Sequence, residues 1–167
     1  MSVIIRDANI EDVQEILEII NYEIIHSTSI YDYSEQNLEQ REKWFQDKKS
    51  TNMPVIVAEV GNLVVGFGSY GIFRPKEAYK YCVEHSVYIH KDFRNLGIGK
   101  LILEHLINLA SEQGFHTMIA GIDAENKDSI GFHKKFGFVE VGRIKESGYK
   151  FDRWLDLVFM QLFLNNH

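Results

Sequence analysis

The chain has 167 residues, of which 45% are hydrophobic and 13% aromatic, so it holds enough apolar material for one sizeable core and we expect a single domain over residues 1–167. Twenty-four Asp and Glu residues against 18 Lys and Arg give a formal net charge of -6, the wrong sign for a protein that binds nucleic acid or an anionic membrane through its overall field. A single cysteine excludes an internal disulfide, and because the sequence shows neither a signal segment nor an apolar run near the roughly 20 residues of a membrane span, we expect a cytoplasmic protein.

The N-terminal third predicts a strand and two helices. Residues 3–6 read as a short strand, and Asn9 with Asp12 three positions later is typical of a helix start. Apolar residues then recur at helical spacing, at Ile10, Val13, Ile16, Leu17, Ile20 and Ile24. Residues 26–34 are polar and aromatic without a clear period, which favours a loop, and a second helix is expected over 37–47.

The remainder predicts a mixed α/β (α+β) fold in which antiparallel strands come first and strand-helix-strand units follow. Strands are expected over 55–60 and 63–70, joined by hairpin chemistry at Gly61-Asn62, and over 81–90. An apolar helix follows and ends at Gly114. Next we expect a strand over 117–122, a helix over 127–135 closed by Gly137, and strands over 138–144 and 155–164.

The segment from Arg94 to Lys100 joins a strand to the apolar helix and carries two glycines, Gly97 and Gly99. A helix N-terminus presents unpaired N–H groups and a partial positive charge, so this loop suits a diphosphate. It is not a Walker loop, because Leu101 follows the lysine where Ser or Thr is required. It also lacks the third glycine of a dinucleotide-binding loop. Taken alone, two glycines more often make only a tight turn.

Residues 87–100 resemble the signature of the GCN5-related N-acetyltransferases (GNAT), and residues 126–138 resemble a second element of that family. The resemblance implies the GNAT fold, a central mixed and mostly antiparallel sheet flanked by helices, and acetyl-CoA as co-substrate. It implies that the following residues bind the coenzyme: Val87, Tyr88, Ile89, Arg94, Asn95, Leu96, Gly97, Ile98, Gly99, Lys100 and Asn126.

A narrower resemblance, to the phosphinothricin and methionine sulfoximine N-acetyltransferase branch, rests on Arg74-Pro75 and on residues 83–88 and 147–150, with Trp154 and Asp156. It implies acetylation of the α-amino group of a small glutamate-like amino acid. It also implies a homodimer, with the strand that carries Trp154 at the interface. Competing interpretations keep the coenzyme site but change the acceptor to a polyamine or a protein N-terminus, or describe a coenzyme sensor that has lost catalysis.

Amide formation from a thioester needs an unprotonated amine, a stabilised oxyanion and a departing thiolate. Because side chains alternate on a strand, Glu84 shares the more polar face with Cys82, Ser86, Tyr88 and His90, opposite Val83, His85, Val87 and Ile89. We expect Glu84 to be the catalytic base, against the alternative of a carboxylate that only binds a cation or a backbone donor. The family resemblance places the oxyanion donor at a backbone N–H near Val87 or Tyr88.

Two histidines complete the candidates. On the apolar face His85 is expected to be a hydrogen-bonded core residue. The resemblance places His133 near the coenzyme sulfur, as the acid that protonates the thiolate or, equally, as a structural or coenzyme-contacting residue.

The acceptor pocket needs a cation for a carboxylate or phosphinate, and Arg74 is the best candidate, against the alternative of an ordinary exposed arginine. Phe73, Tyr31 and Tyr33 are expected to line this pocket, although such aromatics are usually core residues. No Cys or His spacing suggests a metal site.

Overall fold

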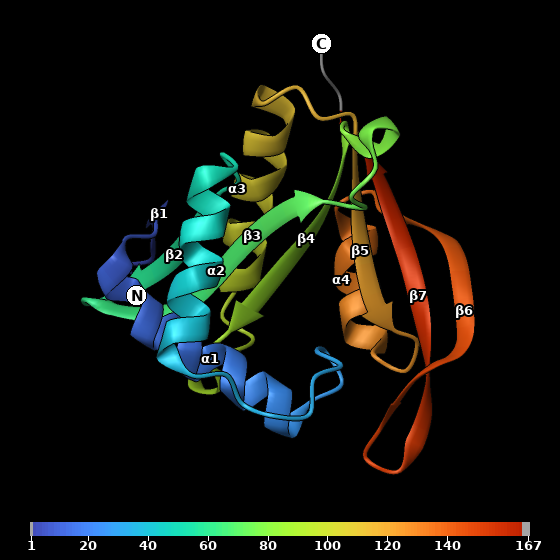
Figure 1. The fold of residues 1–167 in the computed structure, drawn as a ribbon, viewed down its shortest axis with the longest axis horizontal. Coiled ribbons are helices and arrows are strands. Elements are labelled where there is room, and N and C mark those ends of the chain that lie inside the picture. The colour runs from blue at the N-terminus through green and yellow to red at the C-terminus, as the bar shows by residue number, and fades with distance from the viewer. Residues whose placement is uncertain (1, 165–167) are drawn as a thin grey trace.

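The computed structural model describes residues 2–164 and is built on one seven-stranded sheet in the order β1-β2-β3-β4-β5-β7-β6. All neighbouring strands are antiparallel except β4 and β5, which are parallel. The strands are β1 (Ile4–Asp7), β2 (Val55–Val60), β3 (Leu63–Ile72), β4 (Cys82–Ile89), β5 (Thr117–Asp123), β6 (Val139–Lys150) and β7 (Arg153–Phe163). The α-helices are α1 (Val13–His26), α2 (Leu38–Ser50), α3 (Ile98–Glu112) and α4 (Lys127–Lys135), and Figure 1 shows their arrangement.

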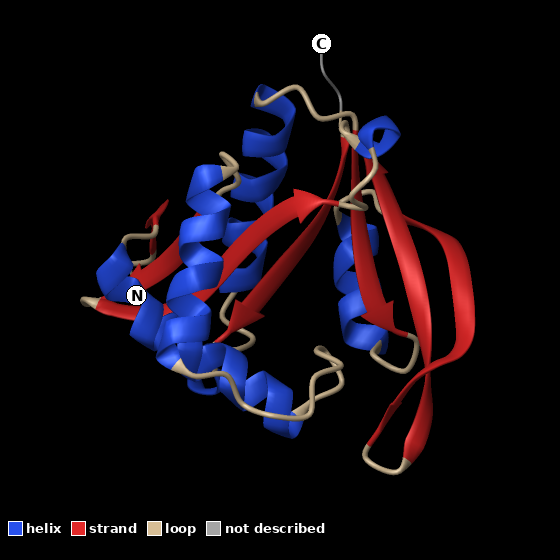
Figure 2. Cartoon of the chain, viewed as in Figure 1, coloured by secondary structure: helices blue, strands red, loops and turns tan. Residues whose placement is uncertain are grey.

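Helices cover both faces of the sheet. The apolar faces of α1 and α2 pack on β2 and β3 in one core cluster, which includes Ile16, Phe45 and Phe67. On the other face α3 and α4 pack through Ile102 and Ile130 against a second cluster. Figure 2 shows the helices on the two sides of the strands. The expected mixed, mostly antiparallel sheet flanked by helices is confirmed.

Local sequence signals account for most element boundaries. Asn9 and Asn37 each form a capping box at a helix start, and Gly61-Asn62 adopts the positive φ angles of a tight hairpin, 54° and 68°. Several predicted boundaries differ by one to three residues, and two further differences are structural. The first turn, Ile10–Asp12, is a 3-10 helix, and β6 continues to Lys150 because β7 pairs with it as a second long hairpin. That extension is exposed and lacks regular alternation, so periodicity gave no sign of it.

The parallel pair β4 and β5 stays together over only part of its length. Cys82, Val83 and Glu84 pair with Thr117–Ile119, whereas β4 continues to Ile89 and β5 to Asp123 without further pairing between them. In Figure 1 the two strands diverge from this point. The divergence leaves one backbone edge of β4 free of β5, next to the start of α3.

Candidate active site

The edge of β4 that β5 leaves unpaired exposes the backbone N–H and C=O groups of alternate residues. Successive residues of an antiparallel strand direct their N–H and C=O groups to opposite edges. The N–H of His90 donates to Val65 O of β3 at 2.8 Å, so Tyr88, two residues earlier, also faces β3. The backbone groups of Val87 and Ile89 therefore face the side from which β5 has diverged. Of the two expected oxyanion donors, this register favours Val87 over Tyr88.

The glycine loop lies at the end of β4 and forms the start of α3. Gly97 is the N-cap residue with φ 80°, and Asn95 also has a positive φ of 62°. No side chain caps the helix and its first turn contains no acidic residue, so the N–H groups at its start are open to a ligand. A Cβ at Gly97 would meet nothing within 4 Å, so this glycine is required by its backbone angle. The arrangement fits a pyrophosphate.

The charged and polar residues expected around the coenzyme already have protein partners. Arg94 forms an ion pair with buried Glu23 of α1, and Lys100 is exposed and lies 3.7 Å from Glu104. Asn126 caps α4, its side chain accepting a hydrogen bond from the N–H of Ser129 at 3.0 Å. Leu96 is exposed and the Ile98 side chain is buried in the core, so only the backbone of Ile98 is open to a ligand.

Glu84 lies at the last paired position before β4 and β5 diverge. Its carboxyl oxygen Oε2 is positioned over Gly121 of β5, where an added Cβ would lie 3.4 Å from it. The surrounding protein raises the pKa of Glu84, and the positive charge of Arg74 partly opposes that shift. The side chain retains a solvent-exposed side through which an amine can approach. Of the expected site residues, Arg74 is thus the cation whose charge acts on the Glu84 carboxyl.

The aromatic residues expected to line the acceptor site pack against different strands. Phe73 packs edge-on against Phe159 of β7, with the Arg74 guanidinium 5.3 Å from its ring centroid. Tyr31 lies in the loop between α1 and α2, and its ring covers Gly148 of β6 so closely that an added Cβ would lie 2.6 Å from it.

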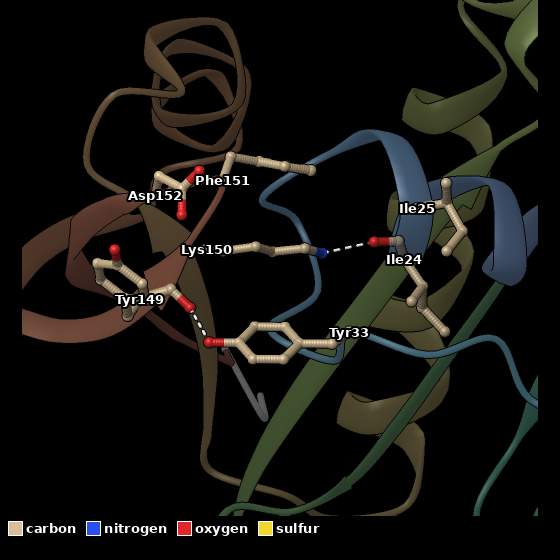
Figure 3. A pocket seen from close by; sticks show the side chains of 7 residues that line it. All are labelled: Ile24, Ile25, Tyr33, Tyr149, Lys150, Phe151 and Asp152. Atoms are coloured by element: carbon tan, nitrogen blue, oxygen red, sulfur yellow. Dashed lines mark hydrogen bonds between the residues drawn. The ribbon is translucent and has the colours of Figure 1, made fainter.

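That loop is held in place by the β6–β7 hairpin. The buried ammonium of Lys150 donates to three backbone carbonyls, Ile24 O at 2.6 Å, Ser27 O at 2.8 Å and Ile30 O at 2.7 Å. Tyr33 donates to Tyr149 O beside a cavity of about 320 Å³. Figure 3 shows this contact with the loop and the contact of Lys150 with Ile24 of α1. Sequence reasoning included Lys150 only in the segment that resembles the narrower branch and gave it no role, because its partners lie more than 100 residues away.

His133 on α4 and His85 on β4 form a buried pair on the face of the sheet that α3 and α4 cover. Their Nε2 atoms are 3.0 Å apart, and His133 Nδ1 lies 2.7 Å from the carbonyl oxygen of Ser129. A carbonyl requires a donor, so Nδ1 of His133 carries the proton, its Nε2 accepts, and His85 Nε2 donates. Burial lowers the pKa of His133, and it lowers that of His85 to about 3, an effect to which the neighbouring His133 adds.

This tautomer bears on the expected role of His133 as a general acid. Its single proton is committed to Ser129 O, and its other nitrogen accepts a hydrogen bond from His85. In this arrangement His133 has no proton to give to a leaving thiolate. The geometry instead favours the structural alternative, and His85 is the hydrogen-bonded core residue that its apolar face predicts.

A further cavity of about 180 Å³ lies on the Glu84 face of β4. Its polar lining consists of Asp32, Gln36, Arg41, Ser86 and Tyr88, and Trp44 and Phe67 supply apolar walls. Arg41 is only 5% exposed, and sequence reasoning missed it. The sequence feature that could have identified Arg41 is its position on the same face of α2 as Phe45, where an apolar residue is expected instead of a cation.

Comparison with known proteins agrees with this geometry. The model of the Acetyltransferase (GNAT) family matches residues 16–138. The chain belongs to this family. It is 42% identical over 166 residues to an L-methionine sulfoximine/L-methionine sulfone acetyltransferase from Pseudomonas aeruginosa, covering 99% of this chain and 96% of the relative. It is 30% identical to a phosphinothricin N-acetyltransferase from Streptomyces viridochromogenes, covering 94% and 85%.

A solved structure supports the coenzyme assignment. The putative acetyltransferase from Salmonella typhimurium with its cofactor acetyl-CoA superposes with a TM-score of 0.96 at 36% identity, covering 100% of this chain and 96% of that one. This GNAT chain is therefore an acetyl-CoA-dependent acetyltransferase, and the uncapped α3 start and the free β4 edge fit that coenzyme. None of the helices within residues 2–164 is long and apolar enough to cross a membrane. Across the same residues, no three His, Cys, Asp or Glu side chains gather as metal ligands.

Proposed function

We propose that this acetyltransferase acts on the α-amino group of a small glutamate-like amino acid, of the methionine sulfoximine, methionine sulfone or phosphinothricin type. The observation that supports the proposal is that Glu84 lies at the last paired position before β4 and β5 diverge, where the positive charge of Arg74 acts on its carboxyl. An α-amino acid presents an amine and a carboxylate on one carbon, which a neighbouring base and guanidinium complement. The names of the relatives from Pseudomonas and Streptomyces support the same acceptor class.

In this reaction each of the proposed site residues has a defined role. Acetyl-CoA supplies an acetyl group activated as a thioester. Glu84 takes the proton of the acceptor amine, directly or through a water molecule, and Arg74 holds the adjacent carboxylate. The Val87 N–H donates to the developing oxyanion, and the start of α3 with Gly97 and Gly99 holds the pyrophosphate. Transfer is direct within a ternary complex: the amine attacks the thioester carbonyl, the C–S bond breaks and the coenzyme leaves as its thiolate, with no acyl-enzyme intermediate.

Two further properties belong to the proposal. Large apolar side chains are exposed on β6, β7 and their connecting turn, among them Val139, Ile144, Tyr149, Phe151 and Trp154, which supports a homodimer through this hairpin. A cytoplasmic location fits an enzyme that draws on acetyl-CoA.

The test is thiol release from acetyl-CoA with a panel of acceptors: methionine sulfoximine, methionine sulfone, phosphinothricin, a polyamine and a basic N-terminal peptide. We expect fast release with the glutamate-like acceptors alone. Release with only the polyamine or the peptide would refute the acceptor class while keeping the coenzyme site. Coenzyme binding without release for any acceptor would favour a sensor.

A further inference from the structure

Glu23, near the end of α1, is a buried carboxylate with partners in two different segments of the chain. Its side chain is only 8% exposed, and its Oε1 pairs with the guanidinium of Arg94 in the glycine loop, residues 94–100. Its Oε2 accepts a hydrogen bond from Ser27 Oγ at 2.7 Å, shorter than the 3.0 Å from that hydroxyl to the Glu23 backbone carbonyl. Ser27 begins the loop between α1 and α2, residues 27–37, which we call the acceptor loop. One carboxylate therefore joins the loop at the start of α3 to the loop that carries Tyr31.

The contact with Glu23 orients Arg94 without using all of its donors. Nη2 is bound to Glu23 and Nε lies 3.4 Å from Ile89 O at the end of β4, whereas within residues 2–164 Nη1 forms no hydrogen bond. The side chain is 42% exposed, so a ligand can reach it. A guanidinium holds its N–H donors in one rigid plane, so two fixed nitrogens set the direction of the third. Arg94 can therefore donate to an anion at the glycine loop and keep its bond to Glu23.

Burial makes the contact between Glu23 and Arg94 costly to break. A buried carboxylate that loses its cation keeps an uncompensated charge, which strongly destabilises the folded state. We therefore expect an anion at Arg94 to bind beside the ion pair and not to replace it. Burial lowers the pKa of the Lys150 ammonium, and the charges of Asp32 and Glu23 partly oppose that shift. Because Lys150 also binds Ser27 O, both cations that hold these loops interact with Glu23.

The first residues of the acceptor loop depend on this network. Ser27 Oγ, besides donating to Glu23, accepts a hydrogen bond from the N–H of Ser29 at 3.1 Å. Between them, the Thr28 hydroxyl donates to the buried carboxylate of Asp123 on β5. The orientation of the Glu23 carboxylate thus sets Ser27, and Ser27 sets the turn that leads to the rest of the loop. A change at the glycine loop can reach this turn through Glu23 and Ser27.

We propose that Glu23 is a positioning residue that couples the coenzyme site to the acceptor loop. It holds Arg94 where the guanidinium meets the diphosphate of the coenzyme, and it holds Ser27 at the start of the acceptor loop. Coenzyme binding then fixes Arg94, Glu23 and Ser27 in turn and orders the loop. Because coupling between two sites is reciprocal, an acceptor bound at the loop tightens coenzyme binding by the same factor. This last effect alone rests on the proposed function.

The experiment has two readouts. Hydrogen exchange of residues 27–37, followed by mass spectrometry, is compared with and without coenzyme A. The Kd of coenzyme A is titrated with and without saturating methionine sulfone, a pair that cannot react because no acetyl group is present. In the parent we expect coenzyme A to slow exchange in the acceptor loop about fivefold or more, and methionine sulfone to lower the Kd of coenzyme A by a similar factor.

Two variants cut the network at different bonds. Ser27→Ala removes the side-chain bonds of the acceptor loop but leaves the ion pair, so the Kd of coenzyme A alone should stay within about twofold of the parent. The slowed exchange and the effect of methionine sulfone should both disappear. Glu23→Gln keeps the shape but removes the charge that holds Arg94, so it should also weaken coenzyme A binding about tenfold. Glu18→Gln, exposed on the same helix, is the matched control and should behave as the parent.

The outcomes separate this inference from the proposed function. A parent whose acceptor loop exchanges equally with and without coenzyme A would overturn the inference. So would a Ser27→Ala variant that retains the slowed exchange, and this arm decides the question even if Glu23→Gln does not fold. If coenzyme A slows exchange in the parent but methionine sulfone neither changes its Kd nor is acetylated, the acceptor of the proposed function is wrong and the coupling to the loop stands.

Discussion

Glu84 is held where its carboxyl is harder to ionise than in water, which suits a base that must also release its proton. Activity should therefore fall as pH drops through a pKa above the ordinary value for glutamate. We expect Glu84→Gln to lower kcat by about 10²- to 10⁴-fold and to remove this acidic limb, while the Kd for acetyl-CoA stays within twofold. A pH profile of kcat/KM with a binding titration measures both. An unchanged kcat would assign Glu84 to binding only.

Glu84→Gln should lower activity, but it should not lower the stability of the fold. The raised pKa means that ionisation of Glu84 costs the folded state free energy once pH exceeds the unfolded value. Gln removes that cost, so the free energy of unfolding of Glu84→Gln should not be lower than that of the parent at neutral pH. The difference should widen in favour of the variant as pH rises through the raised pKa. Denaturant melts at several pH values give the comparison.

His133 and His85 make a prediction that distinguishes positioning from acid catalysis. We expect His133→Phe to lower the free energy of unfolding by about 1–3 kcal/mol, because His85 Nε2 becomes a buried donor without a partner. KM for acetyl-CoA should rise, while kcat at saturation should fall less than tenfold and the pH profile of kcat should keep its shape at high pH, where a general acid would lose its proton. A large fall in kcat together with a changed high-pH profile would restore the general acid.

A double variant is the control for this pair. In His85→Phe/His133→Phe both polar partners are gone, so the unsatisfied donor disappears and most of the lost stability should return. Additive losses in denaturant unfolding would mean that the two rings stabilise the fold independently of their mutual hydrogen bond.

At the scale of elements, the β6–β7 hairpin positions a loop that is more than 100 residues away in the chain. Lys150→Met should leave three buried carbonyls without their donor and lower the free energy of unfolding by about 2–4 kcal/mol. Because the loop also carries Tyr31 and Asp32, the acceptor KM should rise more than that for acetyl-CoA. Lys145→Met, an exposed lysine on the same strand, is the matched control. Equal effects of the two variants would exclude the anchoring role.

Local sequence signals predicted most element boundaries, but they predicted only part of the candidate site. Alternation along β4 correctly placed Glu84 and His85 on opposite faces, and the two glycines marked the start of α3. The His85–His133 bond and the cavity at Arg41 join residues that are tens of positions apart. The periodicity of the local sequence cannot predict such contacts, because they depend on how α2 and α4 pack on the two faces of the sheet.

At the scale of the whole molecule, the edge of the sheet formed by β6 is long and exposed and carries several large apolar side chains among its charged ones. Trp154 is 61% exposed and packs edge-on against Tyr149, and an unprotected edge of this kind favours association with another chain. If two copies pair through this hairpin, the interface lies next to the anchor of the acceptor loop, so dimerisation and acceptor binding are coupled.

The proposed dimer is tested by Trp154→Asp, which places a charge in the apolar patch. Sedimentation velocity should show a dimer for the parent and a monomer for the variant, since a stable interface of roughly 800 Å² per partner cannot desolvate an unpaired carboxylate without loss. Leu63→Asp, at the β2–β3 hairpin far from β6 in the sheet order, should leave the dimer intact. A parent that sediments as a monomer at micromolar concentration would refute the dimer, and the coupling of acceptor KM to protein concentration would vanish with it.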